Sequence, residues 1–126
     1  MSDMQRVSDH LRRLGYEIEV EDHFTRAVHE NNPVILVRGF EGGVMLVTAF
    51  KVDESNDESK VLYFVNDLNL QAISARFVVD GQGDFTMEVW LPSPYDPEGF
   101  TNLFARWQRD LAMVIQHKDA RAILAS

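Results

Sequence analysis

The chain of 126 residues contains no cysteine, which excludes disulfide bonds, cysteine-ligated zinc and thiol chemistry. It also lacks an apolar run of the roughly 18 residues that a membrane-spanning helix needs. Its first ten residues, MSDMQRVSDH, have neither the basic start nor the apolar stretch of a signal peptide. These absences favour a cytoplasmic protein without a membrane partner.

Basic residues are scarce as well. The chain has 12 lysines and arginines against 20 aspartates and glutamates, which gives a net charge of −8. Such a surface repels phosphate backbones, and no basic patch is apparent, so we expect no nucleic-acid partner. The length and the ordinary hydrophobic fraction of 45% predict a single globular domain over residues 1–126.

The first third of the chain has the pattern of a helix followed by a strand. Ser2 and Gln5 have the spacing of a capping box, and apolar residues then recur every three or four positions up to Gly15. This predicts a helix of about a dozen residues. Residues 16–20 alternate between apolar side chains and carboxylates, which indicates a strand at or near a sheet edge. We expect a short helical turn at residues 25–29.

Two β-branched runs, residues 34–37 and 44–50, flank a glycine-rich turn and predict a hairpin. The acidic segment at residues 53–58 has a calcium loop as its functional alternative. It lacks the alternating ligand positions and the central glycine of an EF-hand. We therefore expect a solvated loop in which Ser55 and Glu58 form the capping box of the next helix.

The helix after this loop places two asparagines together near its end. Asn66 and Asn69 are three positions apart and so share a face. They can satisfy free backbone groups at the helix end, or their amides can hold a ligand or a partner peptide. The structural role is favoured. The apolar face of this helix is predicted to comprise Val61, Phe64, Val65 and Leu68.

Residues 73–79 and 84–91 predict a second hairpin. Its inner face is apolar on both strands, with Ile73, Ala75, Phe77 and Val79 facing Phe85, Met87, Val89 and Leu91. The outer face is too apolar for a fully wetted surface, because Val78 and Trp90 lie among its polar residues. We predict that this outer face binds a protein or a second subunit through Arg76, Val78, Glu88 and Trp90.

The last helix starts at Asp96-Pro97-Glu98, which combines a capping residue, a proline at the first helical position and an acidic first turn. Residues 118–126 either extend this helix or fray. A stripe of large apolar side chains along the helix is predicted to be core rather than a ligand groove. It comprises Phe100, Leu103, Phe104, Trp107, Leu111, Val114 and Ile115.

The predicted element order is α-β-β-β-α-β-β-α, with a mostly antiparallel five-stranded sheet packed with helices. Consecutive hairpins and segregated helices make the fold class α+β rather than parallel α/β. This order, in a small acidic chain with a long C-terminal helix, resembles the type III secretion chaperone-like fold.

Within that fold, the passage VNDLNLQAISARFVVDGQGDFTMEVWL is similar to the YbjN family. The shared features are Asn66 and Asn69 at a helix end, the hairpin after them and the terminal helix; Gly15-Tyr16 also suits the family. The resemblance implies a dimer that acts as a sensory transduction regulator. It also implies similarity to dimeric secretion chaperones of this fold, which hold extended client segments on exposed apolar patches.

Three functions are compatible with these patterns to different degrees. We expect a non-enzymatic protein-binding module, a homodimer with a chaperone-like or regulatory role and no cofactor. The alternative is a small-ligand sensor with a pocket between helices and sheet, to which Asn66, Asn69 or Arg76 would contribute. A hydrolase or metal enzyme is disfavoured, because no Gly-x-Ser-x-Gly is present and no two histidines have zinc-site spacing. The histidines are His10, His23, His29 and His117.

Overall fold

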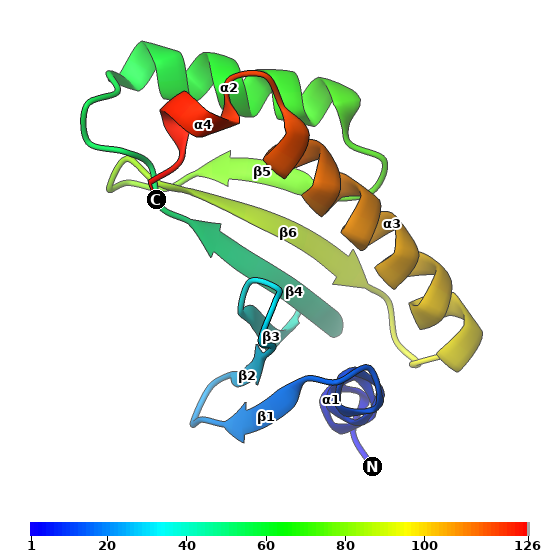
Figure 1. Cartoon of the computed structure of the whole chain (residues 1–126). Coiled ribbons are helices and arrows are strands. Elements are labelled where there is room, and N and C mark those ends of the chain that lie inside the picture. Colours follow the sequence, from blue (N-terminus) through cyan, green and yellow to red (C-terminus); the bar gives the residue numbers. More distant parts are fainter. Residues whose placement is uncertain (126) are drawn as a thin grey trace. The chain divides into compact units, whose positions relative to one another are not determined.

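The computed structural model describes residues 1–125 of the chain, which form an α+β fold (Figure 1). Its strands lie in the order β1-β2-β3-β4-β6-β5. The chain divides into two compact units: residues 1–48 with 89–102, and residues 49–88 with those from 103 onward. In chain order the elements are α1 (Asp3–Arg13), β1 (Glu17–Val20), β2 (Thr25–Val28), β3 (Ile35–Phe40), β4 (Gly43–Phe50), α2 (Glu58–Gln71), β5 (Arg76–Val79), β6 (Phe85–Leu91), α3 (Pro97–Gln116) and α4 (Ala120–Ile123).

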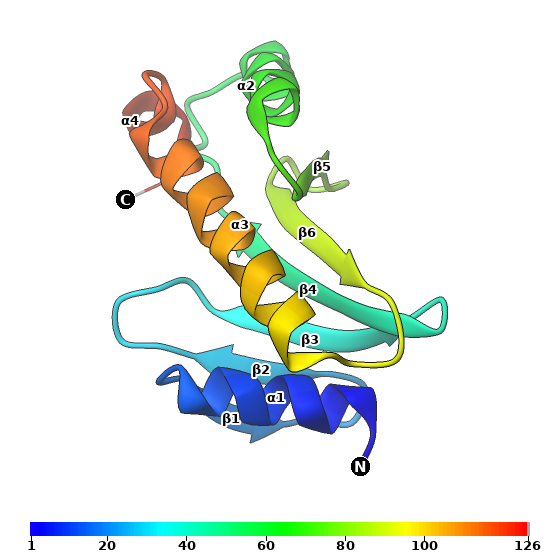
Figure 2. The same cartoon turned by 90° about the vertical axis from the view of Figure 1, so that its right-hand side faces the viewer.

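Helix α1 begins at the predicted capping box. The Ser2 hydroxyl accepts a hydrogen bond from the Gln5 backbone N–H, and the Gln5 side chain accepts one from the Ser2 backbone N–H. Val7 and Leu11 are buried on the inner face of the helix. In the first unit α1 packs against β1, β2 and β3, and Figure 2 shows it lying along the first two of these strands.

The predicted helical turn at residues 25–29 is wrong, because this segment forms strand β2. A hydrogen bond from Glu21 N–H to the Phe24 carbonyl closes the turn, and β2 pairs antiparallel with both β1 and β3. Thr25 and Ala27 are buried, whereas Arg26 and Val28 are only partly covered. Pairing with β1 on one side and β3 on the other decides a segment that has no strong local preference. The sheet therefore has six strands rather than five.

Strand β1 forms one edge of the sheet, as predicted, and Glu17 and Glu19 are exposed on it. The alternation predicts that the apolar side chains share the covered side of the strand, but Val20, the last residue of β1, is 80% exposed. Glu21 bonds across to β2 through the Phe24 carbonyl, and in an antiparallel pair every second residue does so. Ile18 and Val20 are the intervening residues, so their backbone N–H and C=O groups point to the open edge. This edge has backbone donors and acceptors available for another strand.

The predicted hairpin of β3 and β4 is confirmed. Its turn is shorter than the glycine-rich segment, because only Glu41 and Gly42 lie outside the strands. Both have positive φ, 49° and 76°, which fits the twist of a two-residue hairpin turn. A Cβ on Gly39 would lie 3.9 Å from the sulfur of Met4 in α1, so that side of β3 faces the helix. Phe40, the next residue, points to the opposite side.

In the second unit the capping box predicted for Ser55 and Glu58 is wrong. Helix α2 is capped by Asp57, whose side chain accepts a hydrogen bond from Lys60 N–H at 2.9 Å. Ser55 instead donates its backbone N–H and its hydroxyl to Asp53. Ser55 and Asp57 are both suitable as N-cap residues, and Asp57, which directly precedes the first helical residue, is the one that caps the helix.

The apolar face of α2 is buried as predicted and packs near strand β5. The hairpin of β5 and β6 is also confirmed, but β5 begins only at Arg76. Ile73, predicted to lie on the inner face, is 52% exposed. Phe85 is the centre of this core: its ring contacts those of Phe50, Phe64 and Phe77 with centroid separations of 5.1, 5.8 and 6.4 Å.

Helix α3 starts at Pro97, and the Asp96 carboxylate accepts a hydrogen bond from Gly99 N–H at 2.7 Å. Most of the predicted stripe is buried or partly buried, including Trp107 at 2% exposure. Ile115 is the exception, with 60% of its side chain exposed. It lies at the edge of the stripe, about 100° around the helix from the buried Val114, and in the last turn of α3.

The end of the chain does not simply extend α3 or fray, contrary to the prediction. It forms the short helix α4 and then pairs with the loop before α2. Leu124 makes an antiparallel bridge with Val52, and Ala125 N–H donates to the Lys51 carbonyl at 3.0 Å. Ser126, the last residue of the predicted tail, lies outside the described residues. Within residues 1–125, no helix combines the length and apolar character needed to cross a membrane.

Candidate functional site

Three of the predicted partner-binding residues lie on the outer side of the hairpin in the second unit. The Arg76 guanidinium donates to the Glu88 carboxylate at 2.9 Å across the two strands. Val78, the next outward residue on β5, is 41% exposed. The charges are therefore paired with each other, and the apolar side chain remains open to solvent.

Trp90, the fourth predicted residue, belongs to the first unit. Its indole N–H donates to the Phe40 carbonyl at 2.8 Å, and 43% of the side chain is exposed. A Cβ on Gly43 would lie 2.7 Å from two indole carbons and 2.2 Å from the Leu91 carbonyl oxygen. The indole thus rests directly on a glycine backbone, which fixes the ring while leaving one side open.

Phe40 and Arg38 accompany this indole on the side of the sheet opposite α1. Phe40 is 39% exposed, and the guanidinium carbon of Arg38 lies 5.5 Å from its ring centroid. No local pattern in the sequence places Phe40 beside Trp90, because 50 residues separate the two.

The two asparagines of the family resemblance have different surroundings. Asn69 makes two hydrogen bonds with the Phe77 backbone on edge strand β5, at 2.8 and 2.9 Å. Its side chain therefore pairs with a strand rather than with the end of its own helix. Asn66 is exposed and lines a hollow between α2 and α4. Neither converges with Arg76, whose guanidinium is engaged by Glu88.

Asp110, which no motif in the sequence marks, is the one buried carboxylate among residues 1–125. It accepts backbone N–H bonds from Ile73, Ser74 and Ala75 at 2.8 to 3.0 Å. These bonds hold the segment between α2 and β5. A possible signal was its position, since it falls three residues after Trp107 and four before Val114 on the buried stripe.

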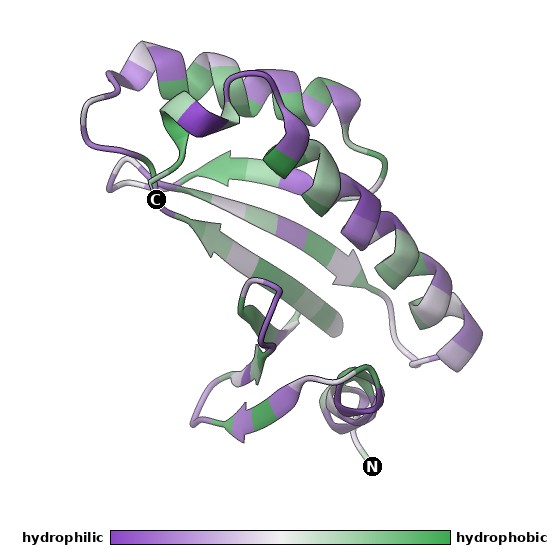
Figure 3. Ribbon diagram, viewed as in Figure 1, coloured by the Kyte–Doolittle hydropathy of each residue, from purple (hydrophilic) through white to green (hydrophobic). Residues whose placement is uncertain are grey.

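Helix α2 has a second apolar side that faces outward. Leu62 is 48% exposed, Tyr63 79% and Leu70 77%, all on the far side from the buried face. Apolar side chains therefore lie on more than one side of the helix. Its ribbon changes between green and purple along its length (Figure 3). A helix with apolar residues on both sides is usually covered on both sides.

Three of the histidines have hydrogen-bond partners in different parts of the fold. His10 contacts the Tyr95 hydroxyl through Nδ1 at 2.7 Å, and burial, followed by the charge of Arg13, lowers the pKa of His10. His29 accepts a backbone hydrogen bond from Asn31. Across residues 1–125, no group of three or more potential metal ligands occurs together.

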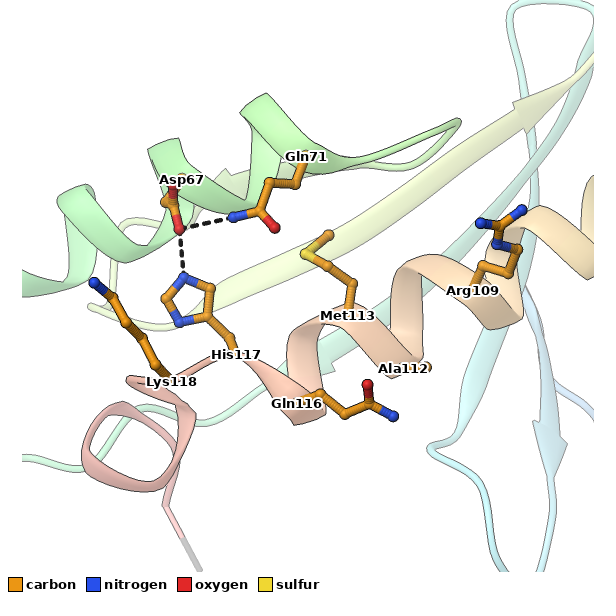
Figure 4. A pocket seen from close by; sticks show the side chains of 8 residues that line it. All are labelled: Asp67, Gln71, Arg109, Ala112, Met113, Gln116, His117 and Lys118. Carbon is orange, nitrogen blue, oxygen red and sulfur yellow. Dashed lines mark hydrogen bonds and ion pairs between the residues drawn. The ribbon is translucent and has the colours of Figure 1, made fainter.

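A groove of about 750 Å³ lies between α2 and α3 in the second unit (Figure 4). Asp67 stands on its α2 side and accepts hydrogen bonds from both His117 and Gln71. His117 Nδ1 accepts the Asp119 backbone N–H, so Nε2 carries the ring proton donated to Asp67. The remaining lining residues are Arg109, Ala112, Met113, Gln116 and Lys118.

The fold is that of the type III secretion chaperones. A chain in the heterodimeric ExoU–SpcU complex of Pseudomonas aeruginosa matches with a TM-score of 0.63 and 16% identity, over 86% of this chain and 94% of that one. A chain in the HopA1–SchA chaperone–effector complex matches with a TM-score of 0.58 and 12% identity, over 86% and 91%.

A family model described as "Putative bacterial sensory transduction regulator" matches residues 3–117, and the chain belongs to this family, YbjN. The crystal structure of YbjN from E. coli has a TM-score of 0.77 and 12% identity, with 98% of this chain and 96% of that chain covered. A search of curated proteins gives no match.

Proposed function

We propose that this chain is a non-enzymatic protein-binding module, a homodimer with a chaperone-like or regulatory role. The observation that carries the proposal is the half-exposed Trp90, held against Gly43 and bonded to Phe40. Chains of the same fold occur in a chaperone–effector complex, which supports a protein as the partner.

Trp90 has the properties of an interface anchor. Aromatic side chains contribute much of the binding energy in protein interfaces when they are buried by a partner. The indole is already fixed by one hydrogen bond and by its contact with the backbone, so binding would cost little side-chain entropy. The neighbouring Phe40 and Arg38 extend the apolar contact and add a cation for a carboxylate of the partner.

The second unit contributes a separate proposed contact on the outer side of its hairpin. Val78 is the exposed apolar residue there, and the ion pair of Arg76 with Glu88 borders it. Charged groups at the rim of an interface favour the correct partner more than they strengthen binding. These residues remain the predicted protein-binding set of the hairpin, together with Trp90.

The outward side of α2 supports self-association. Leu62, Tyr63 and Leu70 would be covered if two copies packed their α2 helices together. A two-fold interface brings the same helix from each copy into contact, so one apolar face suffices for both. Light scattering on the purified protein would give twice the mass of the 126-residue chain, and Leu70→Lys would shift the protein to the monomer.

The test of partner binding is affinity capture from the native lysate with wild-type protein, Trp90→Ala and Leu14→Ala. Leu14 is a matched control, because it is 45% exposed but lies at the end of α1. We expect a stoichiometric protein that wild type and Leu14→Ala retain and Trp90→Ala loses, with all three proteins folded by circular dichroism at the capture temperature. Equal capture by all three proteins would contradict the role of Trp90.

A small-ligand sensor is the second candidate, and the groove between α2 and α3 favours it. Of the three polar side chains predicted to converge on a pocket, none lines this groove. Asn69 and Arg76 are engaged by other groups, and Asn66 lines a different hollow. A ligand site would therefore use other residues than those predicted from the sequence.

A further inference from the structure

We infer that the groove between α2 and α3 binds a small organic acid with two anionic groups joined by an apolar body. This site is independent of the proposed protein-binding surfaces, because Trp90, Val78 and the outward side of α2 do not line it. The inference rests on the free charges of the groove, its apolar floor and its length (Figure 4).

The charged side chains of the groove that have no ion-pair partner are positive. Arg109 and Lys118 line it, and neither forms an ion pair with any of residues 1–125. Asp67 supplies the only carboxylate of the lining, and its Oδ2 atom already accepts bonds from His117 and Gln71. With neutral histidine the lining charge is 2 − 1 = +1, in a chain whose net charge is −8.

The floor of the groove is apolar between these cations. Ala112 and Met113 occupy the turn of α3 that follows Arg109, and the flexible thioether of Met113 adapts to different shapes. Gln116 adds an amide that can donate or accept one turn later. An aliphatic ligand body would cover the methionine, and its ends would meet the charged and amide groups.

The length of the groove requires a ligand with two separated anions. Arg109 and Lys118 stand at opposite ends of it in Figure 4. Lys118 follows Arg109 by nine residues, and the part of that interval within α3, from Arg109 to Gln116, alone rises roughly 10 Å along the helix axis. A single small anion such as phosphate could meet one cation only. A linear dicarboxylate with six to eight carbons can reach both ends.

The test uses methyl-labelled methionine and two-dimensional NMR on the full chain, with suberate as the probe. Of the five methionines, Met113 alone lines the groove, while Met45 and Met87 are buried elsewhere and serve as internal references. We expect a saturable shift of the Met113 methyl signal with suberate. The monoanion hexanoate should bind about tenfold more weakly, because one charge-assisted contact is lost.

The variants separate a built site from general attraction to cations. Arg109→Gln and Lys118→Gln should each weaken suberate binding about tenfold. Arg106→Gln is the matched control: it removes the same charge from an exposed position of α3 that does not line the groove, and binding should be unchanged. An unsaturable Met113 shift, equal binding of hexanoate and suberate, or equal effects of all three variants would overturn the inference.

Discussion

The side chain of Asn69 and the backbone of Phe77 form a two-point hydrogen-bonded pair. Oδ1 accepts the Phe77 N–H at 2.8 Å, and Nδ2 donates to the Phe77 carbonyl at 2.9 Å. Phe77 lies on β5, the edge of the sheet, so the amide occupies the position that another strand would take. Asn69 thereby satisfies this edge and prevents strand addition at Phe77.

Asn69→Ala should lower the free energy of unfolding by about 1–3 kcal/mol, since two backbone groups lose their partner. It should also promote self-association through the opened edge of β5. Urea denaturation measures the first effect and light scattering the second. Asn66→Ala is the control, because Asn66 is exposed on the same helix, and a change within about 0.5 kcal/mol is expected. Equal losses in the two variants would contradict the structural role of the pair.

Gly43 is required by the close approach of its neighbours. In Gly43→Ala the new methyl group would lie 2.2 Å from the Leu91 carbonyl oxygen, a backbone atom that cannot move away alone. We expect unfolding to become easier by about 3 kcal/mol or more. Adding Trp90→Ala to this variant removes the indole contact but not the backbone contact, so stability should not return. Urea midpoints of the single and double variants measure this.

Gly81 provides the comparison for Gly43. It lies in the other hairpin turn, and nothing stands within 4 Å of a Cβ placed on it. Gly81→Ala should therefore leave stability within about 0.5 kcal/mol of wild type. A large loss at Gly81 together with a small one at Gly43 would contradict the close approach of the Leu91 carbonyl to Gly43.

His10 makes stability depend on pH. Burial of the ring lowers its pKa from the ordinary value of 6.5, and the nearby Arg13 lowers it further. The unfolded chain therefore takes up a proton at a higher pH than the folded chain does. The stabilising contribution is complete above pH 6.5 and is lost as the pH falls through the folded pKa of His10.

His10→Gln should flatten the decrease in unfolding free energy on going from neutral pH to mildly acidic pH. Urea denaturation at a series of pH values measures the decrease, and an NMR titration of the ring gives the pKa directly. His23→Gln is the control, since His23 is exposed. If the two variants had the same pH profile, or if His10 titrated above 6.5, the buried neutral state of His10 would be wrong.

Local signals in the sequence predicted most of the elements. The capping box of Ser2, the start of α3 at Asp96 and both hairpins depend on residues within a few positions of one another. Alternation along the second hairpin also predicted that Val78 and Trp90 are exposed. These features follow from spacing and turn chemistry, which a single sequence contains.

The features that the sequence did not predict depend on partners eight or more residues away. Strand β2 exists because β3 pairs with it, and the end of the chain is ordered by Lys51 and Val52. The partner of Asn69 lies eight residues ahead, and that of Trp90 lies 50 residues back. Periodicity shows which side a residue faces but does not identify the atom that it meets.

Asp110 provides the sharpest test of such a long-range contact. Its carboxylate is buried on α3 and accepts three backbone N–H groups from residues 73–75. These residues precede β5, and their N–H groups are not part of the hydrogen-bonded pairing between β5 and β6. In Asp110→Asn only one oxygen can accept, and the new amide hydrogens would face at least one of the donors.

Asp110→Asn should therefore lower the free energy of unfolding by about 2–3 kcal/mol and reduce hydrogen-exchange protection at Ser74 and Ala75. Asp119→Asn makes the same chemical change at an exposed carboxylate that forms no cap hydrogen bond, so it should be nearly neutral. The exchange measurement separates the local contact from a general loss of stability. Full protection at residues 73–75 in Asp110→Asn would show that this carboxylate does not hold the segment between α2 and β5.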